Sequence, residues 1–157
     1  VEPEPGNFEL LEKHLEENEI VNVDVIKAAL SAKTGNRMLK IARDSHNHRL
    51  SAIGRSDSGG ESISVYTYSL SDLLKKCIIN KVSLLKMDIE GGEFEVFESL
   101  SPEILSKVDC LILEYHQKSG DFREIETLLR ESKFAVQVFP SRFDKKMGFI
   151  FARNKGK

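Results

Sequence analysis

Hydrophobic positions along the chain follow two different spacings, which separate predicted helices from predicted strands. Phe8, Leu11 and Leu15 lie about one helical turn apart, and similar spacing recurs over residues 92–100 and 121–131. Helices and strands that alternate along a chain indicate an α/β domain with a mostly parallel sheet. The segments with the alternating or continuous apolar pattern of strands are 21–30, 61–70, 82–89, 108–116, 134–139 and 147–153.

Four of these strands carry more specific information. Residues 82–89 and 108–116 are short, nearly continuous apolar runs, which are typical of central parallel strands covered on both faces. Residues 134–139 and 147–153 are joined by a link short enough for an antiparallel hairpin. The sequence therefore predicts a parallel central sheet with an antiparallel hairpin at its C-terminal end.

The length of 157 residues suits one domain with its own hydrophobic core, so we treat 1–157 as a single domain. Within it, residues 37–60 are predicted to be an irregular insert: residues 37–44 could form a short strand, and a polar loop rich in Ser, Gly, Asn and Asp follows. Residues 69–77 are predicted to form a short helix with Ser71 as its N-cap.

Composition narrows the class of protein. Apolar residues make up 40% of the chain and charged residues 31%, with a net charge of −2. Nothing in this balance favours nucleic acid as a partner, and no apolar run reaches the roughly 18 residues of a membrane span. Cys77 and Cys110 belong to no CxxC pair, which favours a reduced, cytoplasmic protein. A homo-oligomer remains compatible with the sequence.

Polar side chains follow two of the predicted central strands. Asp88 and Glu90 end one strand two residues apart, and Glu114 and His116 end the other in the same way. In open α/β sheets, ligands bind beyond the carboxyl ends of the strands. If the two strands are neighbours, three carboxylates and one imidazole share a small area, where one group can act as a base or all can share a cation.

Each of these acids and histidines can also have a purely structural or solvent-exposed role. Acidic residues at strand ends often cap the next helix or face water, and a histidine there is often solvated. His46 and His48 could bind a metal, although two histidines in a polar loop are more commonly solvated. The glycines that follow Glu90 let the backbone turn sharply and approach a ligand closely.

Several motifs together resemble those of FkbM-type methyltransferases. KMDIEGGEFEVF is similar to the family signature K-I-D-V-E-G-A-E followed by an apolar helix. VEPEPGNFELLEKHLEEN resembles the family segment F-E-P-x-P-x-N-F-x-x-L, and VNVDVIKAALSAKTGN resembles the strand after it. LILEYH resembles a later strand that ends in an acid and a histidine. The resemblance covers nearly the whole chain in the family's order.

This resemblance implies an S-adenosylmethionine-dependent methyltransferase with a Rossmann-like, seven-stranded sheet. By position in the motifs, Glu2 would accept hydrogen bonds from the cofactor ribose and Ala29 would lie near the adenine. Asp88 would lie beside both the methyl donor and the acceptor, with Glu90 as its companion. Glu114 would help to bind or orient the acceptor.

The reaction implied is direct displacement of the methyl group by a small-molecule or glycan hydroxyl. Positioning supplies much of the catalysis in such a reaction, and a general base assists a hydroxyl acceptor. Asp88 or His116 is the candidate base, while Glu90 orients it or helps to hold a cation. No metal ligand is assigned, and a divalent metal is the lesser alternative.

The chain departs from the family pattern at its beginning. The first strand and the glycine-rich cofactor loop, of the type D-x-G-A-N-x-G, should precede Glu2 and are not in this sequence. We therefore expect an N-terminally truncated methyltransferase sheet, with these parts upstream in the natural protein. The alternatives are a non-catalytic methyltransferase-like module for binding or assembly, and another nucleotide-binding α/β enzyme such as a dehydrogenase.

Overall fold

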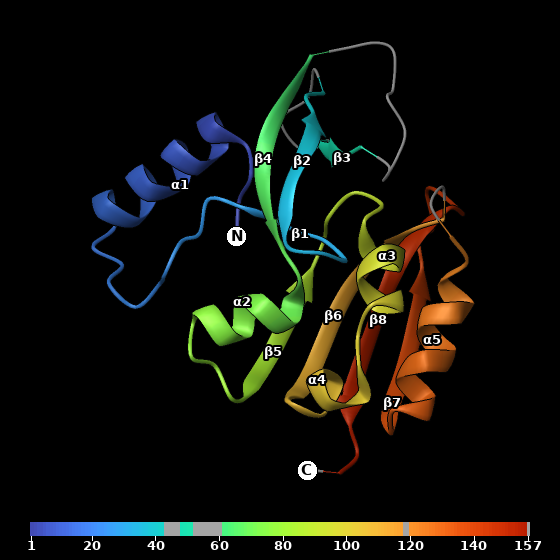
Figure 1. The fold of residues 1–157 in the computed structure, drawn as a ribbon. Helices are drawn as coiled ribbons and strands as arrows, with labels where there is room; N and C mark the ends of the chain where they lie inside the picture. The colour runs from blue at the N-terminus through green and yellow to red at the C-terminus, as the bar shows by residue number, and fades with distance from the viewer. Residues whose placement is uncertain (43–47, 52–60, 118–119, 157) are drawn as a thin grey trace.

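The computed structural model of the chain describes residues 1–42, 48–51, 61–117 and 120–156. Its strands form two four-stranded sheets: sheet A has the order β1-β4-β2-β3, and sheet B has the order β5-β6-β8-β7. Figure 1 shows sheet A in the upper part of the molecule and sheet B in the lower part. The helices are α1 (Pro5–Glu17), α2 (Leu70–Lys76), α3 (Glu93–Glu98), α4 (Pro102–Ser106) and α5 (Phe122–Glu131). The strands are β1 (Ala29–Leu30), β2 (Gly35–Lys40), β3 (Arg49–Leu50), β4 (Ser62–Tyr68), β5 (Val82–Met87), β6 (Val108–His116), β7 (Phe134–Pro140) and β8 (Met147–Asn154).

Both sheets are mixed, which confirms an α/β fold but corrects the prediction of a mostly parallel sheet. Within the described residues, β1 pairs with β4 and β5 pairs with β6 in parallel. The other four strand pairs are antiparallel. The predicted C-terminal hairpin is confirmed, because β7 and β8 pair along their length. Apolar patterns predict strands well but carry little information on the direction of their neighbours.

β5 lies at the edge of sheet B, so the prediction of a central strand over residues 82–89 is wrong. It pairs with β6, with Met87 opposite Leu113. Leu84 is 54% exposed and is therefore not covered on both faces. The place of a strand in a sheet is decided by tertiary contacts, which a short apolar run does not specify. β6 lies between β5 and β8, as predicted for a central strand.

The N-terminal region contains less strand than predicted. Of residues 21–30, only Ala29 and Leu30 form a strand, and Val21 is exposed. Glu2 lies outside the strands. Its backbone N–H donates to the carbonyl of Ile26 at 3.1 Å, so the chain start still runs beside the segment that leads into β1.

One local prediction is corrected. The N-cap of α2 is Ser69 rather than Ser71, because the Ser69 hydroxyl accepts a hydrogen bond from the Asp72 N–H at 3.1 Å. Within the predicted insert, residues 37–40 of the short strand considered over 37–44 belong to β2, and residues 49–50 form β3. The rest of that prediction falls largely on 43–47 and 52–60, which lie outside the described residues.

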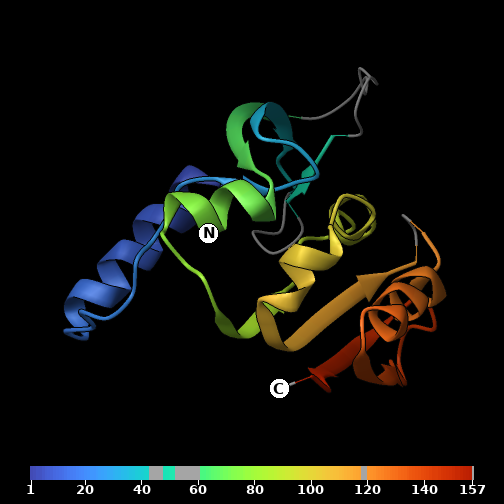
Figure 2. The ribbon, with the colours of Figure 1, turned by 60° about the horizontal axis from the view of Figure 1, so that its bottom comes forward.

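The main hydrophobic core combines side chains of sheet B with those of the helices α2, α3, α4 and α5. Figure 2 shows these helices and sheet B from a second direction. Tyr115 of β6 is buried in it and stacks on Phe122 with ring centroids 4.6 Å apart. Sheet A has a smaller core of its own around Ala29, Leu39 and Val65. Among the described helices, none has the length and apolar character needed to cross a bilayer.

Candidate functional site

A cavity of about 150 Å³ lies between the N-terminal segment, sheet A and the turn after β5. Glu2, Ala29, Asp88 and Glu90 all line it, so the structure brings together four of the six residues predicted for the site. Apolar side chains of sheet A complete much of the wall: Leu30, Leu39 and Leu50. The cavity therefore combines carboxylates with an apolar surface.

Glu2 is held at the cavity by the turn that precedes α1. Its Oε1 accepts a hydrogen bond from the Glu4 N–H at 2.9 Å. Glu4 is itself the N-cap of α1, and its carboxylate accepts from the Asn7 N–H at 2.6 Å. That hydrogen bond is the main reason that the pKa of Glu4 lies below its ordinary value. The two carboxylates thus fix the chain between the cavity and the helix.

The turn after β5 has an unusual backbone. Glu90 has φ +52° and Gly91 has φ +97°, so two consecutive residues lie in the left-handed region. A left-handed conformation costs a non-glycine residue roughly 1–2 kcal/mol. This turn carries Glu90 to the cavity and to His116, and residues with such strain cluster at functional sites.

His116, the last residue of β6, lies between two carboxylates. Its Nδ1 is 3.1 Å from Oε1 of Glu93, and its Nε2 is 3.5 Å from Oε2 of Glu90. The pKa of His116 is raised above its ordinary value, chiefly by the hydrogen bond with Glu93 and against the effect of burial. Asp88, Glu90 and His116 each place one ligand atom within 4.8 Å of the others. His116 does not line the cavity but contacts its wall through Glu90.

Glu93 is a site residue that the sequence analysis did not assign. It begins α3 and is 0% exposed. Its Oε1 faces His116 and also accepts hydrogen bonds from the N–H groups of Ile89 at 3.3 Å and Gly91 at 3.2 Å. From the sequence alone, a glutamate at the start of a helix is explained by its favourable interaction with the positive end of the helix dipole. Its place as the last acid of K-x-D-x-E-G-x-E was the signal that could have identified it.

Glu114 lies two residues before His116 on β6 and is half-buried. Burial raises the pKa of its carboxyl group, and the neighbouring Asp88 raises it further, while His116 lowers it. The expected grouping of acids from the ends of β5 and β6 is therefore present in the structure. Glu114 does not line the cavity and contributes to the electrostatics behind it.

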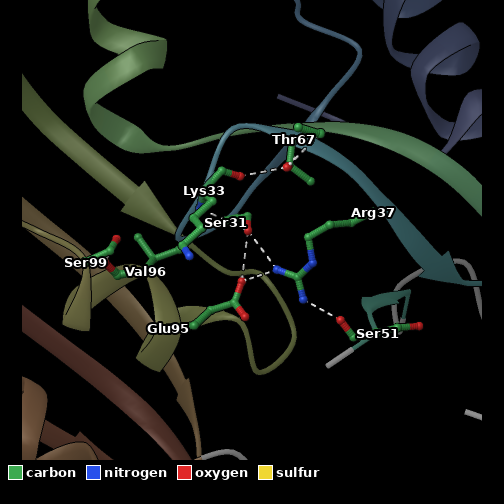
Figure 3. A network of polar contacts seen from close by, with 9 residues as sticks. Ser31, Lys33, Arg37, Ser51, Thr67, Glu95, Val96 and Ser99 are labelled. Atoms are coloured by element: carbon green, nitrogen blue, oxygen red, sulfur yellow. Dashed lines mark hydrogen bonds and ion pairs between the residues drawn. The ribbon is translucent and has the colours of Figure 1, made fainter. Parts of the chain in front are cut away.

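A second polar group joins sheet A to α3 (Figure 3). Arg37 of β2 forms an ion pair with Glu95 of α3. The same guanidinium donates to Ser31 Oγ at 2.7 Å and to the carbonyl oxygen of Ser51. Ser31 Oγ in turn donates to Glu95 Oε1 at 3.1 Å. These contacts fix the cavity wall of sheet A relative to the helix that carries Glu93.

Of the two histidines considered as metal ligands, His48 has a structural contact. Its Nδ1 accepts a hydrogen bond from the Ala42 N–H at 3.0 Å, and the residue lines the cavity. His46 lies outside the described residues, so the hypothesis of a paired site in this loop stays a prediction.

Comparison with known proteins identifies one family model and several relatives. Residues 1–136 match the model of the methyltransferase FkbM domain. A protein named methyltransferase 1 from Beauveria bassiana is 27% identical over 154 residues, which cover 87% of this chain and 62% of that protein. The hexuronic acid methyltransferase AglP from Haloferax volcanii is 24% identical over 156 residues, covering 98% of this chain and 60% of that protein.

A third relative, the methyltransferase sdnD from Sordaria araneosa, is 29% identical over 86 residues, or 50% of this chain and 33% of that protein. The chain spans about 60% of the length of the first two relatives. No solved structure matches significantly. The family model covers most of the chain, including the acids at the end of β5 and the histidine at the end of β6, and the chain therefore belongs to the methyltransferase FkbM domain family.

Proposed function

We propose that this chain is the main part of an S-adenosylmethionine-dependent methyltransferase that acts on a hydroxyl group of a small molecule or a glycan. The observation that carries this proposal is the cavity in which Glu2, Ala29, Asp88 and Glu90 meet. They come from three separate segments of a chain that belongs to a methyltransferase family. Membership of the family alone does not locate a cofactor site. The meeting of these four residues at one cavity supports a site there.

The cavity fits part of the cofactor. A carboxylate such as Glu2 is suited to two neighbouring ribose hydroxyls, and the apolar wall around Ala29 is suited to a base. Its volume of about 150 Å³ is below the roughly 300–1,000 Å³ of complete small-molecule sites. The described residues would thus hold the nucleoside portion. A glycine-rich loop, which the family resemblance implies, would complete the cofactor site.

Asp88 is the proposed base for the acceptor hydroxyl. When bound, S-adenosylmethionine supplies a methyl group on a positively charged sulfur. Asp88 lies on the cavity wall, where its carboxylate can accept the hydroxyl proton as the oxygen forms its new bond to carbon. Both ring nitrogens of His116 already face carboxylates, so His116 is better placed to orient Glu90 than to receive that proton.

A sugar is the acceptor class that the comparisons favour. The relative from Haloferax volcanii is named a hexuronic acid methyltransferase and aligns with 98% of this chain. The acid-rich site of this chain is compatible with a polyhydroxylated acceptor, because carboxylates accept hydrogen bonds from several hydroxyls. A transfer assay with a labelled methyl donor should compare neutral sugars, hexuronates and non-sugar alcohols. Labelling of none of these classes would contradict hydroxyl methylation.

Cofactor binding can be tested separately from activity. The natural protein that contains this chain is expected to gain thermal stability with S-adenosylmethionine or its demethylated product, because both would bind only the folded state. Glu2→Gln should weaken binding by about 10- to 100-fold, as expected for loss of a charge-assisted hydrogen bond. Glu9→Gln is the matched control, since Glu9 is exposed on α1 and does not line the cavity.

The proposal fails if millimolar cofactor neither shifts the melting temperature nor binds in calorimetry. It also fails in its present form if Glu2→Gln and Glu9→Gln bind equally well, because the ribose would then lie elsewhere.

A further inference from the structure

The ends of β5 and β6 bring together a set of side chains suited to a metal ion. Asp88 and Glu90 follow β5, and His116 ends the neighbouring parallel strand β6. One carboxylate oxygen from each acid and one nitrogen of His116 all lie within 4.8 Å of one another. The site thus gathers three ligand atoms from two adjacent strand ends.

The spacing and the chemistry both fit a divalent cation. With metal–ligand bonds of about 2.1 Å, adjacent ligands of an octahedral ion lie about 3.0 Å apart and opposite ones about 4.2 Å apart. The 3.5 Å between His116 Nε2 and Glu90 Oε2 falls in this range. Two carboxylates with one imidazole suit Mn²⁺ or Mg²⁺ better than a soft metal. Three protein ligands also leave positions for water or an acceptor hydroxyl.

Glu93 is an independent reason to expect a cation rather than a solvated group of acids. A histidine that binds a metal commonly donates its other ring N–H to a carboxylate. Nδ1 of His116 has this partner in Glu93, which is 0% exposed. The other carboxylate oxygen of Glu93, Oε2, is also buried and has no hydrogen-bond partner among the described residues. A carboxylate buried this deeply is normally paired with a cation or with hydrogen-bond donors, and a metal-bound His116 that donates from Nδ1 would be such a partner.

The position of His116 suits metal binding. Its Nδ1 lies 3.1 Å from Oε1 of Glu93, and its Nε2 is the ring nitrogen that faces Oε2 of Glu90, at 3.5 Å. A metal ion bound at Nε2 would lie between the imidazole and the carboxylates of Asp88 and Glu90. Lys86 lies 3.7 Å from Asp88, but its side chain is 66% exposed, so it offsets little of this negative charge.

We propose that Asp88, Glu90 and His116 bind a divalent cation of the Mn²⁺ or Mg²⁺ class, with Glu93 as the residue that orients His116. The binding itself does not depend on the proposed function. Its use in catalysis does, since a cation here would hold the acceptor oxygen and ease the loss of its proton beside Asp88. The cation site would then form the acceptor side of the cavity.

Direct binding of Mn²⁺, measured without cofactor or acceptor, tests the site. Titration of the natural protein, followed by the electron paramagnetic resonance signal of free Mn²⁺, should show one site with a dissociation constant below about 1 mM. Asp88→Asn and Glu90→Gln should each weaken binding at least about 10-fold, and Glu93→Gln should weaken it by about 10- to 100-fold. Glu98→Gln is the matched control, because Glu98 lies on the same helix as Glu93 but outside the ligand group.

A second readout locates the ion. Bound Mn²⁺ should broaden the ring resonances of His116 and leave those of His14 on α1 sharp. Circular dichroism verifies that each variant is folded, and Asp88→Asn is the variant of first choice because Asp88 is exposed. The proposal is overturned if Mn²⁺ does not bind saturably, or if the ligand variants bind as well as Glu98→Gln. Cofactor binding without Mn²⁺ binding would refute the cation site alone, and the reverse result would refute the cofactor site alone.

Discussion

The ion pair between Arg37 and Glu95 should stabilise the junction of the two sheets more than a surface ion pair does. Replacement of Arg37 by methionine keeps much of its apolar contact but removes hydrogen bonds to Glu95, Ser31 and a backbone carbonyl. Hydrogen bonds to charged groups contribute about 1.5–3 kcal/mol each, although such values do not add. The side chains are 13% and 27% exposed, so solvent compensates only part of the loss.

We therefore expect Arg37→Met to lower the free energy of unfolding by about 2–3 kcal/mol in urea denaturation. At about 2–4 °C per kcal/mol for a chain of this size, the melting temperature should fall by about 4–12 °C. Combined with Glu95→Gln, the loss should be smaller than the sum of the single losses by about 1–2 kcal/mol, since no unpaired charge remains.

The matched control for this cycle is the exposed pair of Lys13 and Glu17 on α1, where Lys13→Met should cost less than about 1 kcal/mol. Strict additivity of Arg37→Met and Glu95→Gln would refute the reasoning. An equal loss of stability in Arg37→Met and Lys13→Met would also refute it. The junction would then depend on packing alone.

Three further predictions concern the backbone and pH. Gly91→Ala should destabilise the fold by about 1–2 kcal/mol in urea denaturation because of its φ of +97°, whereas Gly92→Ala, the control, has no such strain and should cost less. Gly148→Ala should be more damaging, by about 3 kcal/mol or more, because its new methyl group would lie 2.4 Å from the Tyr115 hydroxyl and 2.7 Å from a backbone carbonyl; a melting temperature close to wild type would contradict this. Since the pKa of Glu4 is lowered by folding, its carboxylate stabilises the protein above its ordinary pKa of 4.5, and this contribution disappears as the pH falls through the lower folded-state value. Glu4→Gln should therefore cost up to about 1 kcal/mol at pH 7 and progressively less in acid, and a constant difference across this range would exclude the explanation.

Local periodicity predicted the elements whose own sequence carries a regular pattern of apolar and polar positions. The apolar stripe of α5 and the alternating pattern of β4 are both found in the structure. The strand predicted over residues 21–30 is mostly absent because alternation alone does not create a partner, and only Ala29 and Leu30 meet β4. α4 was not predicted, although Ser101 followed by Pro102 is a recognisable helix start.

In the candidate site, too, some features could be predicted from the local sequence, and others depend on contacts between distant segments. Asp88 and His116 were predictable because strand ends in an α/β fold are where polar side chains gather. The burial of Glu93 was not, because it results from contact with a histidine that lies 23 positions away in the chain. The location of β5 at the edge of its sheet likewise depends on which segments pair in space, and the apolar run does not contain that information.

The stacking of Tyr115 on Phe122 gives the protein an optical reporter. The chain has three tyrosines and no tryptophan, so no indole dominates its near-ultraviolet absorbance or emission. Tyr66 and Tyr68 lie on β4 of sheet A, and neither is buried, whereas Tyr115 is fully buried in sheet B beside Glu114 and His116. A change of the buried tyrosine signal should therefore report the opening of the sheet that carries the proposed cation site, with no label added.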